Sequence, residues 1–428
     1  PIRSQDPKWV SVRNVLALSG NPTGPAGDAA LAELADSVAR RLPGKLATKY
    51  PKEAVAGRLR TVLDIANRPV AVADVHHDVE DVAEIFTRLN QQGTGVTEAD
   101  VSLAVAATQH GGWVREEFLP FLRNLEESGY EVDPGVAIRV LTGGGEGHVR
   151  LGEVPREFWS SEGFGAAWEN TRESLSAIVS GLVGSGVLSS ALLPSQTALV
   201  PFALLHMKHG ARGFLFPRAL HWYLMACRDS RYSGSSSSTL SEDVRIVREA
   251  TDFAEAIQAL RGALEVEFRL TPDEFLARST WSRPLLLIVY LTLASRKATD
   301  WATGLPLGQP RAEGAVEYGF APHWHSLFPR SRAVLRSPRY DYTPDEVGAV
   351  ANLVALNDRA KDRRWSSTPP SKYLETARVT DEQLTQQLVP LDHDLWDPDR
   401  YRDFLAARAA QLASACNDYL ARLVGSAR

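Results

Sequence analysis

Apolar residues recur at helical spacing along most of this chain, and that periodicity limits its fold more than any other feature. The spacing predicts helices over 26–41, 79–91, 97–109, 116–127, 241–262, 272–278, 284–295 and 380–424. Before residue 300, clean alternation is confined to 69–75, which predicts one short strand. Because a 3.6-residue period dominates, we expect a mainly α protein built from packed helices.

Local signals place some helix ends. Thr97 followed by Asp100 predicts a capping box that opens a helix at residue 98. The run from Ser233 to Thr239 is typical of a polar loop, after which Ser241 is expected to cap the next helix. A further helix is expected near 343–350.

One long stretch, 174–207, carries no charged residue. Its serines, glycines and prolines indicate two buried helical pieces around a turn rather than a membrane span. The apolar run 284–295 is too short to cross a bilayer. Four aromatic and imidazole side chains nearby are expected to pack in the core: His206, His209, His221 and Trp222. No membrane partner is expected.

Composition excludes several classes of protein. Two cysteines in 428 residues exclude a disulfide scaffold, a Cys-rich zinc module and an iron–sulfur protein, and favour a reducing, cytoplasmic location. A net charge of −5 argues against a uniformly basic protein that coats DNA. The chain begins at Pro1 without a signal-peptide pattern, which suggests a processed chain or a fragment of a longer one.

Aromatic, His and Arg residues crowd together after residue 315. The segment 323–331 (HWHSLFPRS) is followed by 351–356 (ANLVAL), Asp362 and 369–374 (PPSKYL). Imidazole suits both metal binding and proton transfer near neutral pH. Between 321 and 373, nine Lys or Arg outnumber five Asp or Glu, which gives this segment a net charge of +4. Such a cluster favours binding to the DNA backbone, and the candidate residues are Arg330, Arg332, Arg359, Lys361, Arg363 and Arg364.

The order of these motifs resembles the ββα-metal (HNH) nuclease module at the C-terminus of GmrSD-type restriction proteins. These are modification-dependent systems that defend bacteria against phage, and SspE-like nickases share their layout. In the family, an acid–His or His–His pair precedes I-F-P-K-S, and A-N-[LI]-V-x-L, an Asn and P-P-S-x-Y-L follow. The resemblance implies a strand–loop–strand–helix unit that holds one Mg²⁺ or Mn²⁺ beside the scissile phosphate of DNA.

The resemblance also implies roles for individual residues. Counting back from Pro369 places Asp362 on the family's metal-binding Asn, and Asp is a competent ligand for a hard cation. His325 matches the other ligand position, so His325 and Asp362 are the candidate metal ligands. The candidate catalytic residues are His325 and His323, which could activate water, together with Asn352, the mid-motif Asn that is expected to hold the loop.

One departure bears on activity. Counting back from Pro329 places Ser326 where the family has its catalytic His. Ser is no general base at neutral pH without an activating partner. Either His323 or His325 replaces the missing base, or this copy does not cut efficiently.

Two further segments resemble elements of the same proteins. Residues 84–97 (EIFTRLNQQGTGVT) are similar to the closing motif of their ParB-like nucleotide-binding domain, whose upstream D-G-Q-Q-R signature is absent here. The resemblance implies that Arg88 reaches a phosphate, Asn90 bonds a base or sugar and Gly93 admits the backbone, with GTP or ATP bound only if an upstream part is present. From the residues alone, 90–95 is a helix end and turn. The segment 231–236, with Leu240 and Asp243, is a third such element.

These expectations combine into one organisation. Residues 1–110 are the remainder of a ParB-like domain, 111–305 a helical domain, and 306–428 an HNH-like nuclease domain with C-terminal helices. The function expected is that of an HNH-type DNA endonuclease or nickase of a phage-defence system, with DNA as its partner and a homo-oligomer as one arrangement. Two alternatives stay open: a catalytically degenerate DNA-binding scaffold and a nucleotide-responsive regulatory subunit.

Overall fold

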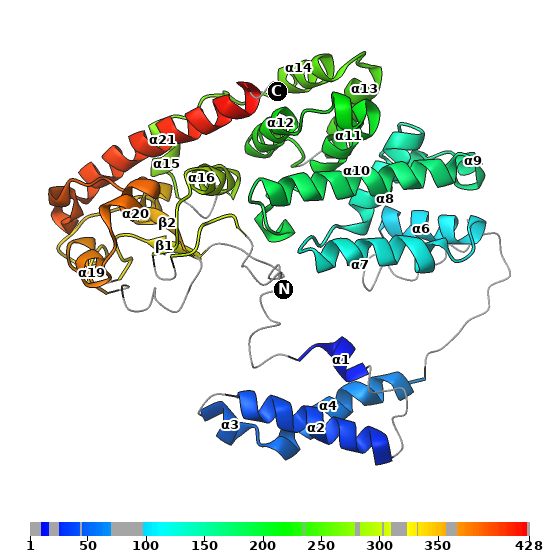
Figure 1. Ribbon diagram of the computed structural model, residues 1–428, viewed down its shortest axis with the longest axis horizontal. Helices are drawn as coiled ribbons and strands as arrows, with labels where there is room; N and C mark the ends of the chain where they lie inside the picture. Colours follow the sequence, from blue (N-terminus) through cyan, green and yellow to red (C-terminus); the bar gives the residue numbers. More distant parts are fainter. Residues whose placement is uncertain are drawn as a thin grey trace. The chain divides into compact units, whose positions relative to one another are not determined.

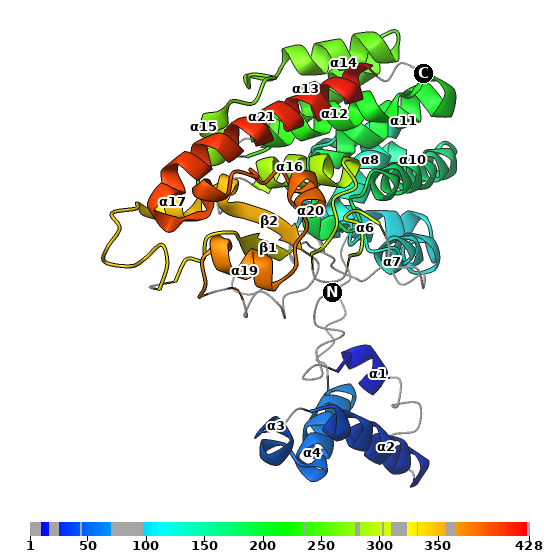
Figure 2. The ribbon, with the colours of Figure 1, turned by 60° about the vertical axis from the view of Figure 1, so that its left-hand side comes forward.

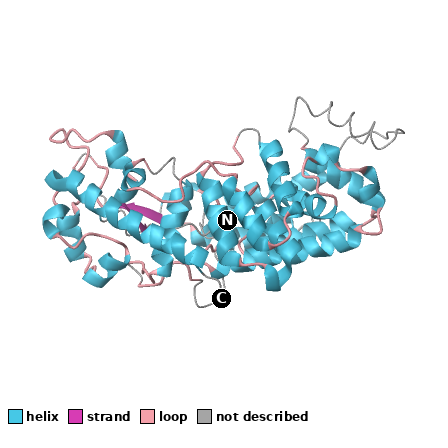
Figure 3. Ribbon diagram, turned by 90° about the horizontal axis from the view of Figure 1, so that it is seen from above, coloured by secondary structure: helices cyan, strands magenta, loops and turns pink. Residues whose placement is uncertain are grey.

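The computed structural model describes residues 10–16, 25–42, 45–69, 97–233, 236–278, 283–301, 304–309, 323–331, 333–356, 365 and 367–425. Over these ranges the protein is mainly helical, as the periodicity predicts, and its one small sheet has two strands (Figures 1 and 3). The expected strand at 69–75, apart from Pro69, and the expected helix at 79–91 lie outside the described residues.

The chain divides into two compact units, one made of residues 1–89 with 317–319 and the other of the rest. The described helices of the first unit are α1 (Val12–Leu16), α2 (Pro25–Arg41), α3 (Lys45–Lys49), α4 (Lys52–Leu63) and the 3₁₀ turn η2 (Asp64–Asn67). Helices α2 and α4 pack together. Their buried apolar side chains, with Val15 of α1, form a small separate core. The division into three domains expected from the sequence stays a prediction.

The second unit begins with a bundle of helices. Its elements up to residue 301 are α6 (Glu98–Gln109), the π-helical turn η3 (Val114–Phe118), α7 (Leu119–Glu127), α8 (Pro134–Gly145), η4 (Leu151–Glu153), α9 (Arg156–Ser160), α10 (Phe164–Gly184), η5 (Ser190–Leu192), α11 (Leu199–Gly213), α12 (Phe216–Arg228), α13 (Ser236–Glu249), α14 (Phe253–Gly262), α15 (Pro272–Leu276) and α16 (Arg283–Ser295). The uncharged stretch thus forms α10 and α11 around a turn, as expected. No helix in the described ranges combines the length and apolarity that a membrane crossing requires.

The same unit continues into the two strands. The elements here are β1 (His323–Ser326), α17 (Pro344–Gly348), η7 (Val350–Asn352), β2 (Leu353–Leu356), α19 (Pro370–Thr376), α20 (Asp381–Gln386), η8 (His393–Trp396), η9 (Pro398–Arg400) and α21 (Tyr401–Gly425). Helix α21 packs against α12, α15, α16 and η7, so it joins the helical bundle to the strand region (Figure 1). One continuous core of buried apolar residues extends from Ala99 to Leu420.

Helix ends test the local signals. Thr97 and Asp100 form the predicted capping box at α6. The prediction for Ser241 is wrong, because α13 begins at Ser236 and the Ser241 hydroxyl donates to the Ser237 carbonyl inside the helix. The single helix expected over 241–262 is two, because Asp252 accepts from the backbone N–H of Glu255 and starts α14.

The histidines near the uncharged stretch lie where the sequence places them. His206 and His221 are buried, and Trp222 is completely so. His209 is half-buried, with its ring edge-on to Phe253. Burial lowers the pKa of all three histidines, that of His221 to about 4, so they are neutral packing residues at pH 7.

Candidate functional site

Strands β1 and β2 bring together two of the motifs singled out in the sequence. They pair antiparallel, with His323 opposite Leu356 and His325 opposite Val354. Helix α19, formed by the P-P-S-K-Y-L motif, follows β2 and lies beside the strand pair (Figure 2). All four residues of β2 are buried, which explains its uninterrupted apolar sequence. The order of elements is therefore strand, long connection, strand, helix.

His325 lies at the contact between β1 and α19. Its side chain is 1% exposed, and its Nε2 is 3.4 Å from the Tyr373 hydroxyl oxygen. That hydroxyl donates to the Leu327 carbonyl at 3.0 Å, so its oxygen faces the imidazole as an acceptor. This arrangement favours the tautomer that carries its proton on Nε2. The two ends of the motif, 48 residues apart, thus meet around one imidazole.

Two aromatic rings surround the same imidazole. Trp365 and Tyr373 stack on each other with centroids 5.5 Å apart, and the ring of His325 meets each of them edge-on, at 5.4 Å and 5.8 Å. Rings of this kind fix the orientation of a histidine and exclude water from one side of it. Tyr373 belongs to a motif noted in the sequence, but nothing in the sequence assigns it or Trp365 to His325.

Asn352 holds the loop that follows β1. It is completely buried. Its Oδ1 accepts from the Phe328 N–H at 2.8 Å, and its Nδ2 donates to the carbonyls of Phe328 at 3.0 Å and Val347 at 3.5 Å. Its own carbonyl accepts from the Leu327 N–H at 2.8 Å. The amide is therefore engaged with main chain, which supports the loop-holding role, and a direct part in chemistry stays a prediction.

Ser326 ends β1 and is half-buried. Because successive side chains of a strand point to opposite faces, Ser326 and His325 lie on opposite faces of the pair. His323 is the first residue of β1, and its side chain is not among those that the structure describes. A base supplied by His325 would therefore act from the face opposite to that of Ser326.

The predicted DNA-binding and nucleotide-binding residues are placed only in part. Arg330 is half-buried. Burial raises the pKa of Tyr401, and the positive charge of Arg330 opposes that rise. Arg330 therefore lies near Tyr401, at the start of α21. The other candidates lie outside the described residues: Arg332, Arg359, Lys361, Asp362, Arg363, Arg364, Arg88, Asn90 and Gly93. Among the residues that the structure describes, no group of three or more His, Cys, Asp or Glu side chains could hold a metal ion. His325 is chemically suited to be a ligand, and its proposed partner Asp362 is not described.

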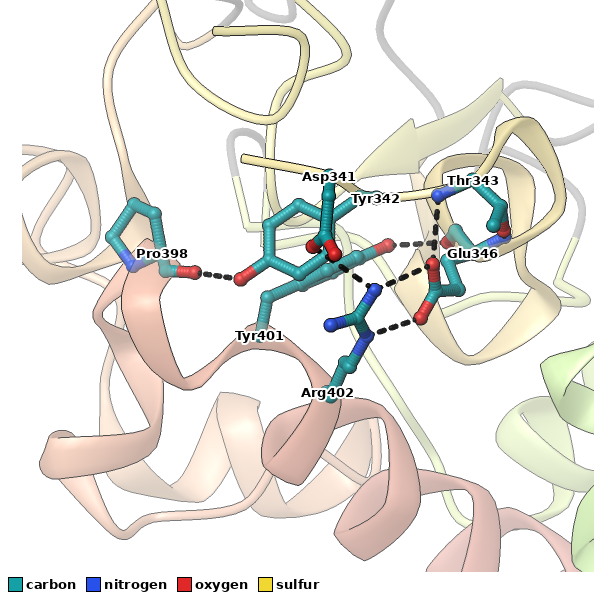
Figure 4. Close-up of polar contacts among 7 residues, drawn as sticks. All are labelled: Asp341, Tyr342, Thr343, Glu346, Pro398, Tyr401 and Arg402. Carbon is teal, nitrogen blue, oxygen red and sulfur yellow. Dashed lines mark hydrogen bonds and ion pairs between the residues drawn. The ribbon is translucent and has the colours of Figure 1, made fainter. Parts of the chain in front are cut away.

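A cluster of polar side chains binds the connection between β1 and β2 to the start of α21 (Figure 4). Arg402 binds both carboxylate oxygens of Glu346, at 2.6 and 3.3 Å, and pairs with Asp341 at 3.2 Å. The Tyr401 hydroxyl donates to the Glu346 carbonyl at 2.7 Å. Arg402 lowers the pKa of Glu346, and the Thr343 capping box adds to this shift. The spacing of Thr343 and Glu346 indicates the capping box in the sequence, whereas no sequence signal indicates that Arg402 pairs with Glu346.

The third motif forms a buried ion pair away from the strands. Arg231 donates two hydrogen bonds to Asp243, at 2.8 and 2.6 Å, and a third to the Ala263 carbonyl at 2.5 Å. The Tyr232 hydroxyl also donates to Asp243, at 2.5 Å. The Asp243 side chain is completely buried. This motif therefore joins the end of α12 to α13 and to the segment after α14.

Neither a family model nor a curated protein matches the chain.

Proposed function

We propose that this protein is a metal-dependent DNA endonuclease or nickase whose chemistry resides in the unit formed by β1, β2 and α19. The observation that carries the proposal is the meeting of His325 with Tyr373, since it joins the two ends of the motif in the order strand, strand, helix. The net charge of +4 between 321 and 373 supports a phosphate-facing role. The resemblance to GmrSD-type proteins supports the assignment to phage defence.

The proposed reaction is hydrolysis of a phosphodiester. A water oxygen bonds to phosphorus, one P–O ester bond breaks, and the leaving oxygen takes up a proton. His325 and Asp362 would hold the divalent cation, and His323 would accept the proton of the attacking water; His325 could accept it only where it is not a metal ligand. A bound Mg²⁺ or Mn²⁺ would stabilise the charge that develops on the phosphate. Asn352 and Tyr373 would fix the loop and the imidazole.

Relaxation of supercoiled plasmid tests the proposal. The chain is incubated with plasmid and Mg²⁺ or Mn²⁺, beside an EDTA control, with His325→Ala and with His393→Ala as the matched control. His393 is an exposed histidine of the same unit and stacks on Trp396. We expect nicking that needs metal, is lost in His325→Ala and persists in His393→Ala. Nicking that survives His325→Ala in a folded protein refutes the assignment.

A degenerate DNA-binding scaffold is the second candidate, and Ser326 in the expected base position favours it. It predicts retention of DNA in a gel shift, weakened by salt, without nicking. The variant Ser326→His separates the two functions, because position 326 is half-buried at the end of β1 and can present a side chain there. If the variant nicks and the native protein does not, the module has lost its base but kept its frame.

A further inference from the structure

Arg408 of α21 is a completely buried arginine that donates three hydrogen bonds to main-chain carbonyls. Its Nε donates to the Leu388 carbonyl at 2.9 Å, Nη1 to the Ala351 carbonyl at 2.6 Å and Nη2 to the Gln387 carbonyl at 3.2 Å. Burial lowers its pKa to about 9. Among the residues that the structure describes, no carboxylate pairs with this guanidinium, and an unpaired guanidinium is costly to bury. Its three hydrogen bonds offset that cost, so the three acceptors are expected to be held firmly.

Gln387 extends this contact to β2. It too is completely buried. Its Nε2 donates to the Ala355 carbonyl at 2.8 Å, and its Oε1 accepts from the Ala355 N–H at 3.4 Å. The side-chain amide thus satisfies the edge of β2 that faces away from β1, as a third strand would.

The backbone between α20 and α21 is shaped for this contact. Leu388 has a φ of +55°, a left-handed conformation that a residue with a branched side chain adopts rarely. Its carbonyl accepts from Arg408, and the preceding carbonyl, that of Gln387, does so too. One guanidinium therefore fixes the turn that presents the Gln387 amide to β2.

The third acceptor connects Arg408 to the candidate site. Ala351 immediately precedes Asn352, whose amide holds Phe328 in the loop after β1. Residues 353–356 then pair with β1 and place Val354 opposite His325. Arg408 and Gln387 thus contact both ends of the segment 351–355, on which the position of His325 depends.

We propose that Arg408 is a positioning residue for the candidate site: it fixes the segment 351–355 against α21 and thereby holds His325 in its working orientation. This inference rests on the proposed nuclease function for its catalytic consequence, but not for its structural one. The planar guanidinium reaches three separated carbonyls at once, whereas the three N–H donors of a lysine ammonium are all on one nitrogen atom. Lysine should therefore replace it only in part.

The test compares Arg408→Met and Arg408→Lys with Arg422→Met, a variant at an exposed arginine of the same helix. Hydrogen–deuterium exchange is followed by mass spectrometry in peptides covering 347–356, with α10 as the internal reference. We expect exchange in 347–356 to rise roughly tenfold in Arg408→Met, less in Arg408→Lys and not at all in Arg422→Met, because local opening exposes only the amides it frees. Plasmid nicking should lose kcat with little change in the KM for DNA.

Gln387→Leu keeps the inference testable if Arg408→Met does not fold. This variant removes the hydrogen bonds to Ala355 but keeps the Gln387 carbonyl that binds Arg408. Hydrogen exchange in the variant should therefore rise at 353–356 alone. Unchanged exchange at 347–356 in folded Arg408→Met, or equal increases there and in α10, overturns the inference. If the native protein does not nick plasmid at all, the proposed function fails, while the exchange data still decide whether Arg408 holds the segment.

Discussion

The buried pair between Arg231 and Asp243 offers the sharpest test of how the helical bundle is stabilised. In Asp243→Asn the guanidinium keeps its buried position but loses its counter-charge, and the Tyr232 hydroxyl loses a charged acceptor. The side chains of Arg231 and Asp243 are only 8% and 0% exposed, so solvent screens the pair little. Removing one partner of such a pair costs about 3–5 kcal/mol of unfolding free energy.

Urea unfolding followed by tryptophan fluorescence measures this loss, since nine of the ten tryptophans lie at residue 113 or beyond, in the second unit. The matched control is Glu249→Gln, which removes an exposed pair with Arg245 on the same helix. That control should cost less than about 0.5 kcal/mol. Replacing both Arg231 and Asp243 with Met and Leu should restore part of the stability, because no charge then stays buried alone. A loss below about 1 kcal/mol in Asp243→Asn would refute the reasoning.

Three further predictions concern packing, pH and a helix end. Gly181→Ala should lower the melting temperature although alanine favours helices, because the new methyl group would overlap the ring of Phe216. The control is Gly184→Ala, where no atom is near the new methyl group, and it should not lower the melting temperature. Since Arg402 lowers the pKa of Glu346, the ion pair stabilises the folded state above the unfolded pKa and is lost as pH falls. Between about pH 6 and about pH 3, the native protein should therefore lose more stability than Glu346→Gln, and equal losses would contradict this. Lys208→Met should lower the unfolding free energy, measured in urea, by about 1 kcal/mol. The reason is that the ammonium donates to the carbonyls of Val247, Arg248 and Ala250 at the end of α13. An unchanged free energy would show that water replaces the ammonium there.

The helices could be predicted where the signal is local. The capping box at Thr97 depends on residues three positions apart, and α10 and α11 follow from an apolar run broken by Gly and Pro. The start of α13 could not be predicted, because its first residues are serines, which are typical of loops. Burial of Leu240, Val244 and Val247 outweighs that preference.

The candidate site was predictable in its parts and not in its contacts. The motifs place His325 and Tyr373 in one module, and the structure brings these two side chains together. Arg408 and Gln387 carry no such signal, because their partners are main-chain carbonyls and amides from distant segments. Any residue type offers those groups, so no pairing pattern marks them in the sequence.

The position of α21 in the chain has a consequence for biosynthesis. The ribosome makes β1 and β2 before it makes the helix that supplies Tyr401, Arg402 and Arg408. Until α21 has left the exit tunnel, the carbonyls of Ala351 and Glu346 lack the donors they have in the folded protein. The strand pair therefore lacks its contacts with α21 until that helix has been made, although domains often fold while their chain is being made. A nascent chain stalled within α21 would present the segment 346–356 without these contacts.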